Sequence, residues 1–489
     1  MKNKYKNVIF FSVVAAYTAF CAYGVIDFDG LSKGNQTSTK IESDSGKYVE
    51  NASQKEEDEL YEADFSDEDL SGMDRDVSDS IKSILRKGNS EFFGGYDIDA
   101  KFLNFVSEKY GKNVLNAISN QGIFDDPEVW FDSCGSSIHV LWSEYLKANG
   151  KKQQNVFKIK TDNPKRVTLA FSGDINLAEG MSTVKYVDSR PNGLSDGFSQ
   201  ELLTRMRGYD IFVINNEFCY SNIGEPLPGK AFTFRASPKR VSQLSKIGAD
   251  VIGIANNHVF DYGEEAFLET LDTIRDAGYP YIGAGKDLSE AKKAVYYIAC
   301  GRKISILAGT QIERSYTYTR AAGKNLPGVM KCLYPEDFCD AIREAKANSD
   351  FCLVFAHWGT EGTPFYGMDQ VALATRFEQS GADVIIGGHT HCLQGIEFIN
   401  DTPVYYSLGN YWFASTGNMP GPYDTGLCEV IITRGGKIKT SFLPCRFEKG
   451  VTEVAGSAGK ERIISFLNEH STGAVVDKFG KVMKKQEED

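Results

Sequence analysis

Two histidines, His389 and His391, stand one residue apart in the stretch GADVIIGGHTHCLQGIE, residues 381–397. They follow an apolar run that predicts a buried strand, and glycine and threonine flank them. The chain has only six histidines in 489 residues, so two within three positions are not a packing pattern. Imidazole nitrogens placed in this way indicate a binding site. One strand end can direct one ring to each of two metal ions, or one ring to a metal and the other to a substrate.

Polar side chains follow the other apolar runs of the chain in the same way. In a sheet covered by helices, residues just past the carboxyl ends of the strands line the site. Each motif alone is more typical of a turn, a helix cap or a core histidine, but their recurrence at strand ends predicts a metal cluster. The residues that follow TLAFSG, IFVIN, VIGIA, CLVFA and VIIGG are Asp174, Asn216, Glu217, Asn256, Asn257, His258, Asp261, His357, His389 and His391.

The donor types suit zinc, manganese or iron, since carboxylate oxygens and imidazole nitrogens bind all three. Six candidate ligands are too many for one closed zinc site. Two divalent ions bridged by a carboxylate and a hydroxide fit the set better. The candidate ligands are Asp174, Glu217, Asn257, His357, His389 and His391.

From Arg166 onward, short apolar runs alternate with helical stretches. Continuous apolar strands separated by helices predict an α/β fold with a sheet covered on both faces, and the polar residues above would meet at one edge of that sheet. A late pair of runs joined at Gly435 and Gly436 predicts a hairpin. The candidate strands are RVTLAFS, YDIFVIN, ADVIGIA, KISILAG, FCLVFAH, ADVIIGG and PVYYSLG.

The first residues, MKNKYKNVIFFSVVAAYTAFCAYGVIDFDG, combine three early lysines with an uncharged, mostly apolar segment from Val8 to Ile26. That segment is just long enough to cross a bilayer as a helix. The charge excess on its amino side predicts a single-pass anchor in the cell membrane with the rest of the chain outside the cytoplasm. A cleaved signal peptide is the alternative, because Ala22 and Gly24 are small residues of the kind found at cleavage sites.

The formal charge of −12 comes almost entirely from one stretch. Residues 40–80 hold 15 Asp or Glu against 4 Lys or Arg, so the remainder of the chain is nearly neutral. No basic stripe is visible, which excludes nucleic acid as a partner on compositional grounds. Residues 27–80 are too polar to bury a core and predict a disordered acidic linker.

Residues 81–160 predict a small helical unit, because apolar side chains recur there at intervals of three and four. Within it, DSCGSSIHVLW brings Cys134, Ser136 and His139 close together in sequence, a possible nucleophile and base. A turn in which Ser136 or Ser137 caps the next helix is the simpler interpretation.

The motifs FSGDINL, INNEF, ANNHVFDYG, AHWGTE, GGHTH and YSLGN occur in that order across roughly residues 165–445. Together they resemble the CapA-type family of capsule synthesis proteins, which is linked to poly-gamma-glutamate. That family is similar in turn to the calcineurin-like metallophosphoesterases. The resemblance implies a layered α/β sandwich with a two-metal site, preceded by a membrane anchor, a tether and the small helical unit.

The resemblance also implies a role for each candidate ligand. Asp174 matches the carboxylate of a first metal, which His391 would also bind, and Glu217 stands where a bridging carboxylate is expected. Asn257 would bind the second metal together with His357 and His389. The implied catalytic residues are His258, which would steady the scissile group or protonate the leaving group, and Asn257.

Two departures from the metallophosphoesterase pattern bear on the first metal. Asn176 occupies the position of a histidine, and Glu217 replaces an aspartate. Lys230 and Arg235 in GKAFTFRASP are candidates for binding an anionic substrate, as is Asn256. A solvated loop with its phenylalanines turned inward is the alternative for that loop.

The expected protein is thus a membrane-tethered, extracytoplasmic hydrolase-like protein that acts in poly-gamma-glutamate synthesis, export or processing, with a capsule synthetase or export complex as a possible partner. A phosphoesterase acting on another cell-surface substrate is one alternative, and a non-catalytic polymer-binding or export subunit is the other. The expected organisation is an anchor at 1–26, a linker at 27–80, a helical region at 81–160, the α/β domain at 161–450 and a helical tail at 451–489.

Overall fold

The protein is seen in a computed structural model that describes residues 75–87, 96, 98–121, 127–153, 155–313, 318–414 and 418–485. The expected anchor at 1–26 and most of the expected linker at 27–80 lie outside these residues. Within the described ranges, no helix combines the length and the apolar character needed to cross a bilayer. Among the described residues the first helix begins at Arg75, so the last six positions of the expected linker are helical.

Helices make up the first part of the described chain. Their apolar faces meet in a shared core that includes Ile81, Phe102, Leu103, Trp130 and Leu141, all fully buried. Asp99 caps α3 by accepting a hydrogen bond from the Phe102 amide at 2.7 Å. The helices are α2 (Arg75–Lys87), α3 (Ala100–Tyr110), α4 (Asn113–Gln121), α5 (Pro127–Cys134) and α6 (Ile138–Ala148).

The residues of DSCGSSIHVLW make contacts that hold the fold together. Ser137 stands at the N-cap position of α6, but its hydroxyl donates to Asp350 at 2.6 Å instead of capping the helix. Burial raises the pKa of the Cys134 thiol to about 12, which leaves no thiolate at neutral pH. His139 is buried, and its Nδ1 lies 3.1 Å from the hydroxyl of Tyr96. These contacts favour the structural interpretation over a nucleophile and base.

The buried His139 makes the protein sensitive to acid. Burial, and after it the positive charge of Lys303, lower the pKa of its ring to about 3. Between that value and the unfolded pKa of about 6.5, the unfolded chain binds a proton that the folded chain does not, so stability falls as pH falls. We expect about 2 kcal/mol of unfolding free energy to be lost between pH 7 and pH 5. Chemical denaturation at both pH values should show this loss in the native protein and a smaller one in His139→Leu.

Two sheets form the body of the α/β part, where the sequence pattern predicted one. The first has the strand order β1-β9-β10-β12-β13-β15-β14, in which β10, β12, β13 and β15 are parallel. Its strands are β1 (Val156–Lys158), β9 (Val295–Ala299), β10 (Arg302–Thr310), β12 (Phe351–His357), β13 (Val384–Gly388), β14 (Ile396–Ile399) and β15 (Thr402–Tyr405).

The second sheet has the order β19-β18-β17-β2-β3-β6-β7, and β16 pairs with the end of β2. The hairpin predicted around Gly435 and Gly436 is confirmed, since β17 and β18 pair antiparallel along their whole length. The strands are β2 (Arg166–Ile175), β3 (Ile211–Asn216), β6 (Val251–Gly253), β7 (Tyr281–Ile282), β16 (Asn410–Trp412), β17 (Tyr423–Thr433), β18 (Ile438–Glu448) and β19 (Val451–Val454).

The continuous apolar runs of these strands reflect burial on both faces. Successive side chains of a strand point to opposite sides, so Leu353 and Phe355 of β12 pack between the two sheets while Val354 packs against the outer helices. In the second sheet, Leu169 of β2 likewise faces the inter-sheet core and Ala170 faces the outer layer. The chain is therefore a layered α/β sandwich with helix, sheet, sheet and helix in succession.

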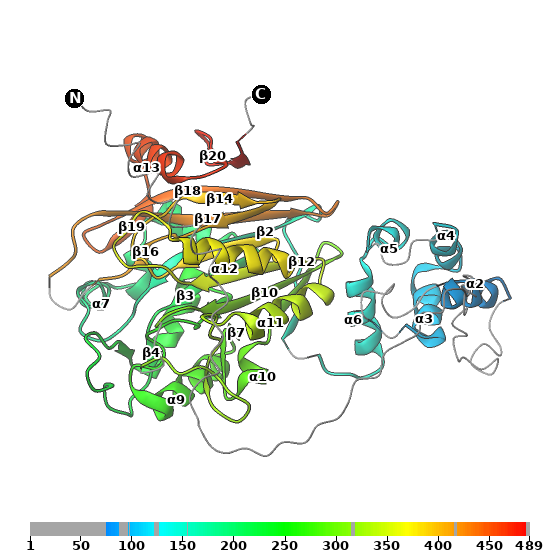
Figure 1. Cartoon of the computed structure of the whole chain (residues 1–489), viewed down its shortest axis with the longest axis horizontal. Helices are drawn as coiled ribbons and strands as arrows, with labels where there is room; N and C mark the ends of the chain where they lie inside the picture. The colour runs from blue at the N-terminus through cyan, green and yellow to red at the C-terminus, as the bar shows by residue number, and fades with distance from the viewer. Residues whose placement is uncertain are drawn as a thin grey trace, which may run out of the picture. The chain divides into compact units, whose positions relative to one another are not determined.

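Helices cover the outer faces of both sheets. Figure 1 shows α11 (Glu336–Ala347) and α12 (Met368–Gln379) lying along β10 and β12. The second sheet is covered by α7 (Ser182–Asp188), α8 (Gln200–Arg207), α9 (Gly263–Asp276) and the 3-10 helices η3 (Gly193–Gly197) and η4 (Pro238–Ile247). Smaller elements between the strands are α10 (Leu288–Ala291) and the strand pairs β4 (Cys219–Tyr220) with β5 (Arg235–Ala236) and β8 (Ala284–Gly285) with β11 (Gly328–Val329).

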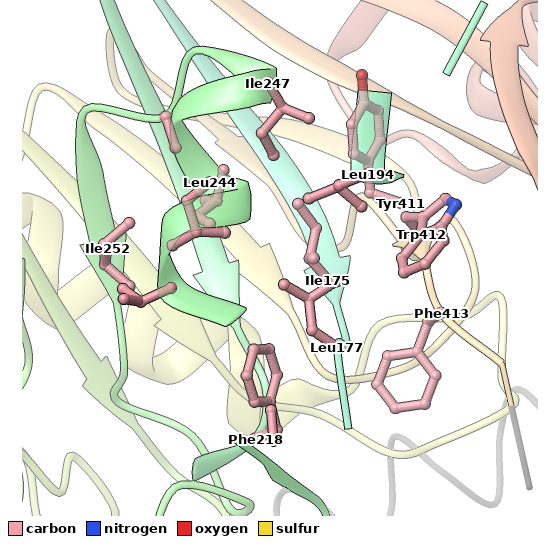
Figure 2. Close-up of a cluster of buried hydrophobic side chains, with 14 of the residues drawn as sticks. Ile175, Leu177, Leu194, Phe218, Leu244, Ile247, Ile252, Tyr411, Trp412 and Phe413 are labelled. Carbon is pink, nitrogen blue, oxygen red and sulfur yellow. The ribbon is translucent and has the colours of Figure 1, made fainter. Parts of the chain in front are cut away.

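A buried apolar cluster holds the end of β2 against β16. Figure 2 shows Ile175 and Leu177 facing the side chains that extend from η3 and η4, with Tyr411 and Trp412 beside them. The Trp412 indole nitrogen donates to the carbonyl of Gly450 at 3.1 Å. Because Asp174 and Asn410 are paired in register directly beside this cluster, its packing fixes the position of both polar residues.

The C-terminal segment is only partly helical. After β19 comes α13 (Ser457–His470), which packs on β18, and the chain then forms the hairpin of β20 (Ala474–Val476) and β21 (Val482–Lys484) where a helical tail was expected.

Candidate metal centre

The candidate ligands lie at one end of the sandwich, where the strands of both sheets finish. Asp174 is the penultimate residue of β2 and pairs in register with Asn215 of β3. His357 is the last residue of β12 and pairs with Gly388, the last residue of β13. The expectation that all ligands share the edge of a single sheet is wrong: the carboxylates and Asn257 come from the second sheet, and the histidines from the first. Two rigid layers therefore meet at the site.

Two groups of side chains could each hold a metal ion. In the first group, one ligand atom from each of Glu217, His357 and His389 lies within 4.8 Å of the others. In the second group, Asp174, Glu217 and His391 meet the same condition. Glu217 belongs to both groups, as a carboxylate that bridges two ions must.

Glu217 is the clearest sign that a cation fits this site. Its side chain is fully buried, and neither carboxylate oxygen has a hydrogen-bond partner in the structure. Burial raises its pKa well above the usual range, and the nearby charge of Asp174 raises it further. An unpaired buried carboxylate is costly unless a cation compensates it. The donor set of carboxylates and imidazoles suits divalent transition metals.

Asp174 is oriented by contacts from both layers. The Asn215 amide donates to its Oδ1 at 2.7 Å, and the backbone N–H of His389 donates to its Oδ2 at 3.2 Å. The Nδ1 atom of His391 lies 3.6 Å from the same carboxylate. Asp174 thus connects the second sheet to the histidine loop of the first.

His391 is held between Asp174 and Asn410, whose amide oxygen lies 2.8 Å from its Nδ1. Burial lowers the pKa of His391, but the charge of Glu217 and the contact with Asp174 outweigh it and raise the pKa to about 10. Since a ligand imidazole must be unprotonated, metal binding here would release a proton.

His357 lies on the other side of Glu217, with its Nε2 3.6 Å from the carboxylate. The amide oxygen of Asn257 lies 2.8 Å from the same nitrogen, and the Asn215 amide lies 3.2 Å from Nδ1. Burial lowers the pKa of His357 well below its ordinary value, and the neighbouring His389 lowers it further. A neutral imidazole is the form that binds metal.

The backbone of the histidine loop is strained. His389 has φ of 92° and His391 has φ of 58°, both in the left-handed region that residues with side chains rarely adopt. Such conformations persist where surrounding contacts impose them, and they concentrate at functional sites. In this loop they turn both rings toward the carboxylates.

Gly388 leaves no room for a side chain at this point. A Cβ atom there would stand 2.8 Å from Oδ1 of Asp174 and 3.1 Å from the Phe355 ring. We expect Gly388→Ala to displace Asp174 and to weaken metal binding by about tenfold or more, the range seen when residues that orient a ligand are removed. Calorimetric titration with Mn²⁺ or Zn²⁺ would measure the change. Gly435→Ala, at a position with open space around it, is the matched control.

His258 faces the same site from the β6 side. Its Nε2 lies 4.0 Å from Glu217, and its Nδ1 lies 2.7 Å from Asp261. Asp261 in turn pairs with Lys230 at 2.6 Å. Burial lowers the pKa of His258, against the opposing effect of the Asp261 charge. The ring is therefore fixed in orientation with one nitrogen directed into the site.

Lys230 and Arg235, which were predicted to bind substrate, make ion pairs and hydrogen bonds within the protein. Lys230 is 6% exposed and pairs with Asp261 and, at 3.2 Å, with Glu313. Arg235 donates to the carbonyls of residues 223 and 224 and stacks on Tyr262. Neither cation is placed to receive an anionic substrate directly.

The side chains of Asn256 and Asn176 form hydrogen bonds with backbone groups. The Asn256 amide donates to Asn215 and to the carbonyl of Asn216, and its oxygen accepts from the His258 N–H. Asn176 donates to the carbonyl of Glu217 at 3.1 Å. Both side chains thus support the segments that carry ligands.

Two residues of the site were missed from sequence. Asn215 contacts both Asp174 and His357, and Asn410 contacts His391. Both stand in the motifs INNEF and YSLGN, so the asparagines at those strand ends were the available signal. Glu361 is 59% exposed, and its carboxylate lies 3.9 Å from His389.

The sandwich and its shared cluster of buried carboxylates and imidazoles define an α/β protein whose site could hold divalent metal ions. Residues 168–415, half of the chain, match the family described as bacterial capsule synthesis protein PGA_cap, and the chain belongs to that family. The family resemblance predicted from the six motifs is thereby confirmed.

Individual relatives agree with this assignment. The chain is 32% identical to the PGA biosynthesis protein CapA of Bacillus subtilis (strain 168) over 258 residues. This alignment covers 52% of the present chain and 66% of the Bacillus subtilis protein. It is 28% identical over 249 residues to the capsule biosynthesis protein CapA of Bacillus anthracis, in an alignment that covers 50% of this chain and 59% of that protein. A probable polyglutamine synthesis accessory protein of Mycobacterium tuberculosis is 24% identical, in an alignment that covers 51% of this chain and 74% of that protein. The chain thus spans less than two thirds of the first two relatives.

Proposed function

We propose that this protein is a metal-dependent, hydrolase-like member of the capsule synthesis family that acts on poly-gamma-glutamate during its synthesis, export or processing. The observation that carries the proposal is Glu217, a fully buried carboxylate that is shared by two groups of potential metal ligands and has no hydrogen-bond partner among the described residues. The names of the relatives supply the polymer, since they refer to PGA, capsule and polyglutamine synthesis.

In the proposed mechanism, the protein's own side chains hold and orient the reacting groups. Glu217 would stand between two ions, with Asp174 and His391 on one side and His357, His389 and Asn257 on the other. Divalent cations bound there would supply a water of lowered pKa and stabilise a developing oxyanion. Cleavage or transfer at a gamma-glutamyl amide requires these same parts.

His258 would move the proton. Asp261 holds its Nδ1, so Nε2 is directed toward the site, where it can hydrogen-bond the scissile group and, when protonated, donate to the leaving group. Lys230 acts one step further back, because it pairs with Asp261 and donates to the carbonyl of Asn257. These contacts make Lys230 a positioning residue for His258 and Asn257.

The proposal includes the location of the protein. The lysines and apolar run of residues 1–26 support a single-pass membrane anchor, with the globular part outside the cytoplasm. Contact with a capsule synthetase or export complex would follow from that placement.

The direct test combines metal analysis with a hydrolysis screen. Purified full-length protein should contain up to two equivalents of zinc, manganese or iron, and the loaded form should shorten poly-gamma-glutamate. Protein that takes up no divalent metal under any loading condition would overturn the proposal. Turnover of phosphate esters with no action on the polymer would favour a phosphoesterase.

Asn176 favours a second candidate, a non-catalytic subunit that binds or exports the polymer. It replaces a histidine of the metallophosphoesterase pattern and uses its amide to hold the Glu217 carbonyl. In that case His258→Ala would leave capsule output unchanged, whereas loss of output would favour the hydrolase.

A further inference from the structure

A cavity lies away from the candidate metal centre. It is a cavity of about 920 Å³ formed by α3, α6, the segment that follows α6, β1 and β9. Its size is at the upper end of the range for ligand sites, ~300–1,000 Å³. Phe105, Val156 and Ile298 give it an apolar lining. We call it the lysine pocket, after the lining residues Lys109, Lys147, Lys151, Lys152 and Lys158.

The charge of the lysine pocket is opposite to that of the whole chain. Five lysines line it against a single carboxylate, Glu144, in a protein with a formal net charge of −12. Glu144 is already paired with Lys109 at 2.7 Å and Lys158 at 2.9 Å, and it accepts from the Tyr110 hydroxyl at 2.9 Å. The single internal acid therefore leaves an excess of positive charge.

The remaining lysines are free to meet a ligand. Lys147, Lys151 and Lys152 are exposed, and none of them has an ion-pair partner among the residues that the structure describes. Three neighbouring ammonium groups beside an apolar surface match a chain that carries carboxylates at regular intervals along a flexible aliphatic backbone.

The strand register shows how far this pocket lies from the candidate metal centre along the direction of the strands, which is the least distance that a ligand touching both must span. Ile298 pairs with Lys303 near the start of β10, whereas His357 pairs with Thr310 at its end. Seven residues of a strand cover about 23 Å. A ligand that touches both sites must be an oligomer or a polymer. A γ-linked glutamate contributes five backbone bonds where an α-linked residue contributes three, so at roughly 6 Å per residue about four or more residues are needed to cover that distance.

We propose that the lysine pocket is a holding site for a polycarboxylate chain, which it grips while another part of the same chain lies at the metal centre. This assignment deepens the proposed function and rests on it for the identity of the polymer. Its consequence is that long polymers bind more tightly than short ones, whereas oligomers too short to span the two sites gain nothing from the lysines.

The test uses full-length protein and fluorescently labelled poly-gamma-glutamate. The combined variant Lys147→Glu, Lys151→Glu and Lys152→Glu should weaken polymer binding about tenfold or more at low salt, since each exposed ion pair changes affinity about two- to fivefold. The difference should shrink as salt is added. The matched control reverses Lys185, Lys239 and Lys478, which are also exposed and lie outside the pocket.

The dependence of binding on polymer length, and the turnover of a small substrate, distinguish the holding site from the proposed function. Di- and triglutamate should bind both combined variants alike, and the pocket variant should keep the unfolding midpoint, metal content and small-substrate turnover of the native protein. Equal losses of polymer affinity in the two variants, or no loss in either, would overturn the holding site. If the protein held no metal and hydrolysed no polymer but still bound the polymer through these lysines, the result would count against the proposed function alone.

Discussion

Replacing Glu217 with glutamine is expected to remove the metal-dependent part of the protein's stability and to lower any hydrolytic rate about a thousandfold. The physical reason is that Glu217 is the side chain shared by both ligand groups, and its carboxylate accepts no hydrogen bond from the residues that the structure describes. Loss of the several kcal/mol that bound cations supply to developing charge corresponds to a rate effect of about that size. The amide has the same shape, so the fold should persist.

Two measurements test this expectation. With free metal at about 100 times its Kd, the unfolding free energy of the native protein should rise by about 2.7 kcal/mol, and that of Glu217→Gln should not change. Glu361→Gln is the control, because Glu361 is more than half exposed and belongs to neither ligand group. Metal stabilisation of Glu217→Gln equal to that of the native protein would show that Glu217 does not bridge.

The second large effect is expected for His258→Gln. If His258 transfers a proton to the leaving group, kcat should fall by about 10²–10⁴ while metal content and KM change little. Asp261→Asn should give a smaller loss of the same kind, because Asp261 only orients the ring. Lys230→Met should act through Asp261 and give the smallest loss of the three.

Leaving-group dependence distinguishes proton transfer from a structural role. A substrate whose leaving group departs without a proton should lose much less rate in His258→Gln than an amide or alkyl ester does. An equal loss for good and poor leaving groups, or a loss of bound metal, would assign His258 a structural role instead.

The site was largely predictable because of where parallel strands end. Asp174, Glu217, Asn257, His357, His389 and His391 each follow an apolar run, and in a parallel sheet such positions meet at one edge. The structure brings all six together. What the pattern did not contain was the pairing between runs, so the division of the ligands between two sheets was not predicted.

The second layer of contacts was harder to predict. Asn215 and Asn410 orient Asp174, His357 and His391, yet their role depends on distances across the sandwich that no local pattern encodes. Lys230 was expected to meet substrate because it is a cation in the loop that follows the candidate ligand Glu217, where it could pair with an anionic group. Its burial against Asp261 and Glu313 follows from the loop's path over the site.

The order of apolar runs and the chemistry of the residues after them determined the α/β class, the family and the ligand types. These are local properties, since strand periodicity and donor atoms belong to the residues themselves. Tertiary structure alone decided that two sheets converge, that Glu217 is buried without a hydrogen-bond partner and shared, and that lysines from separate elements form a pocket. Those features arise from packing between segments far apart in the chain, which fixes distances and burial that the residue order does not specify.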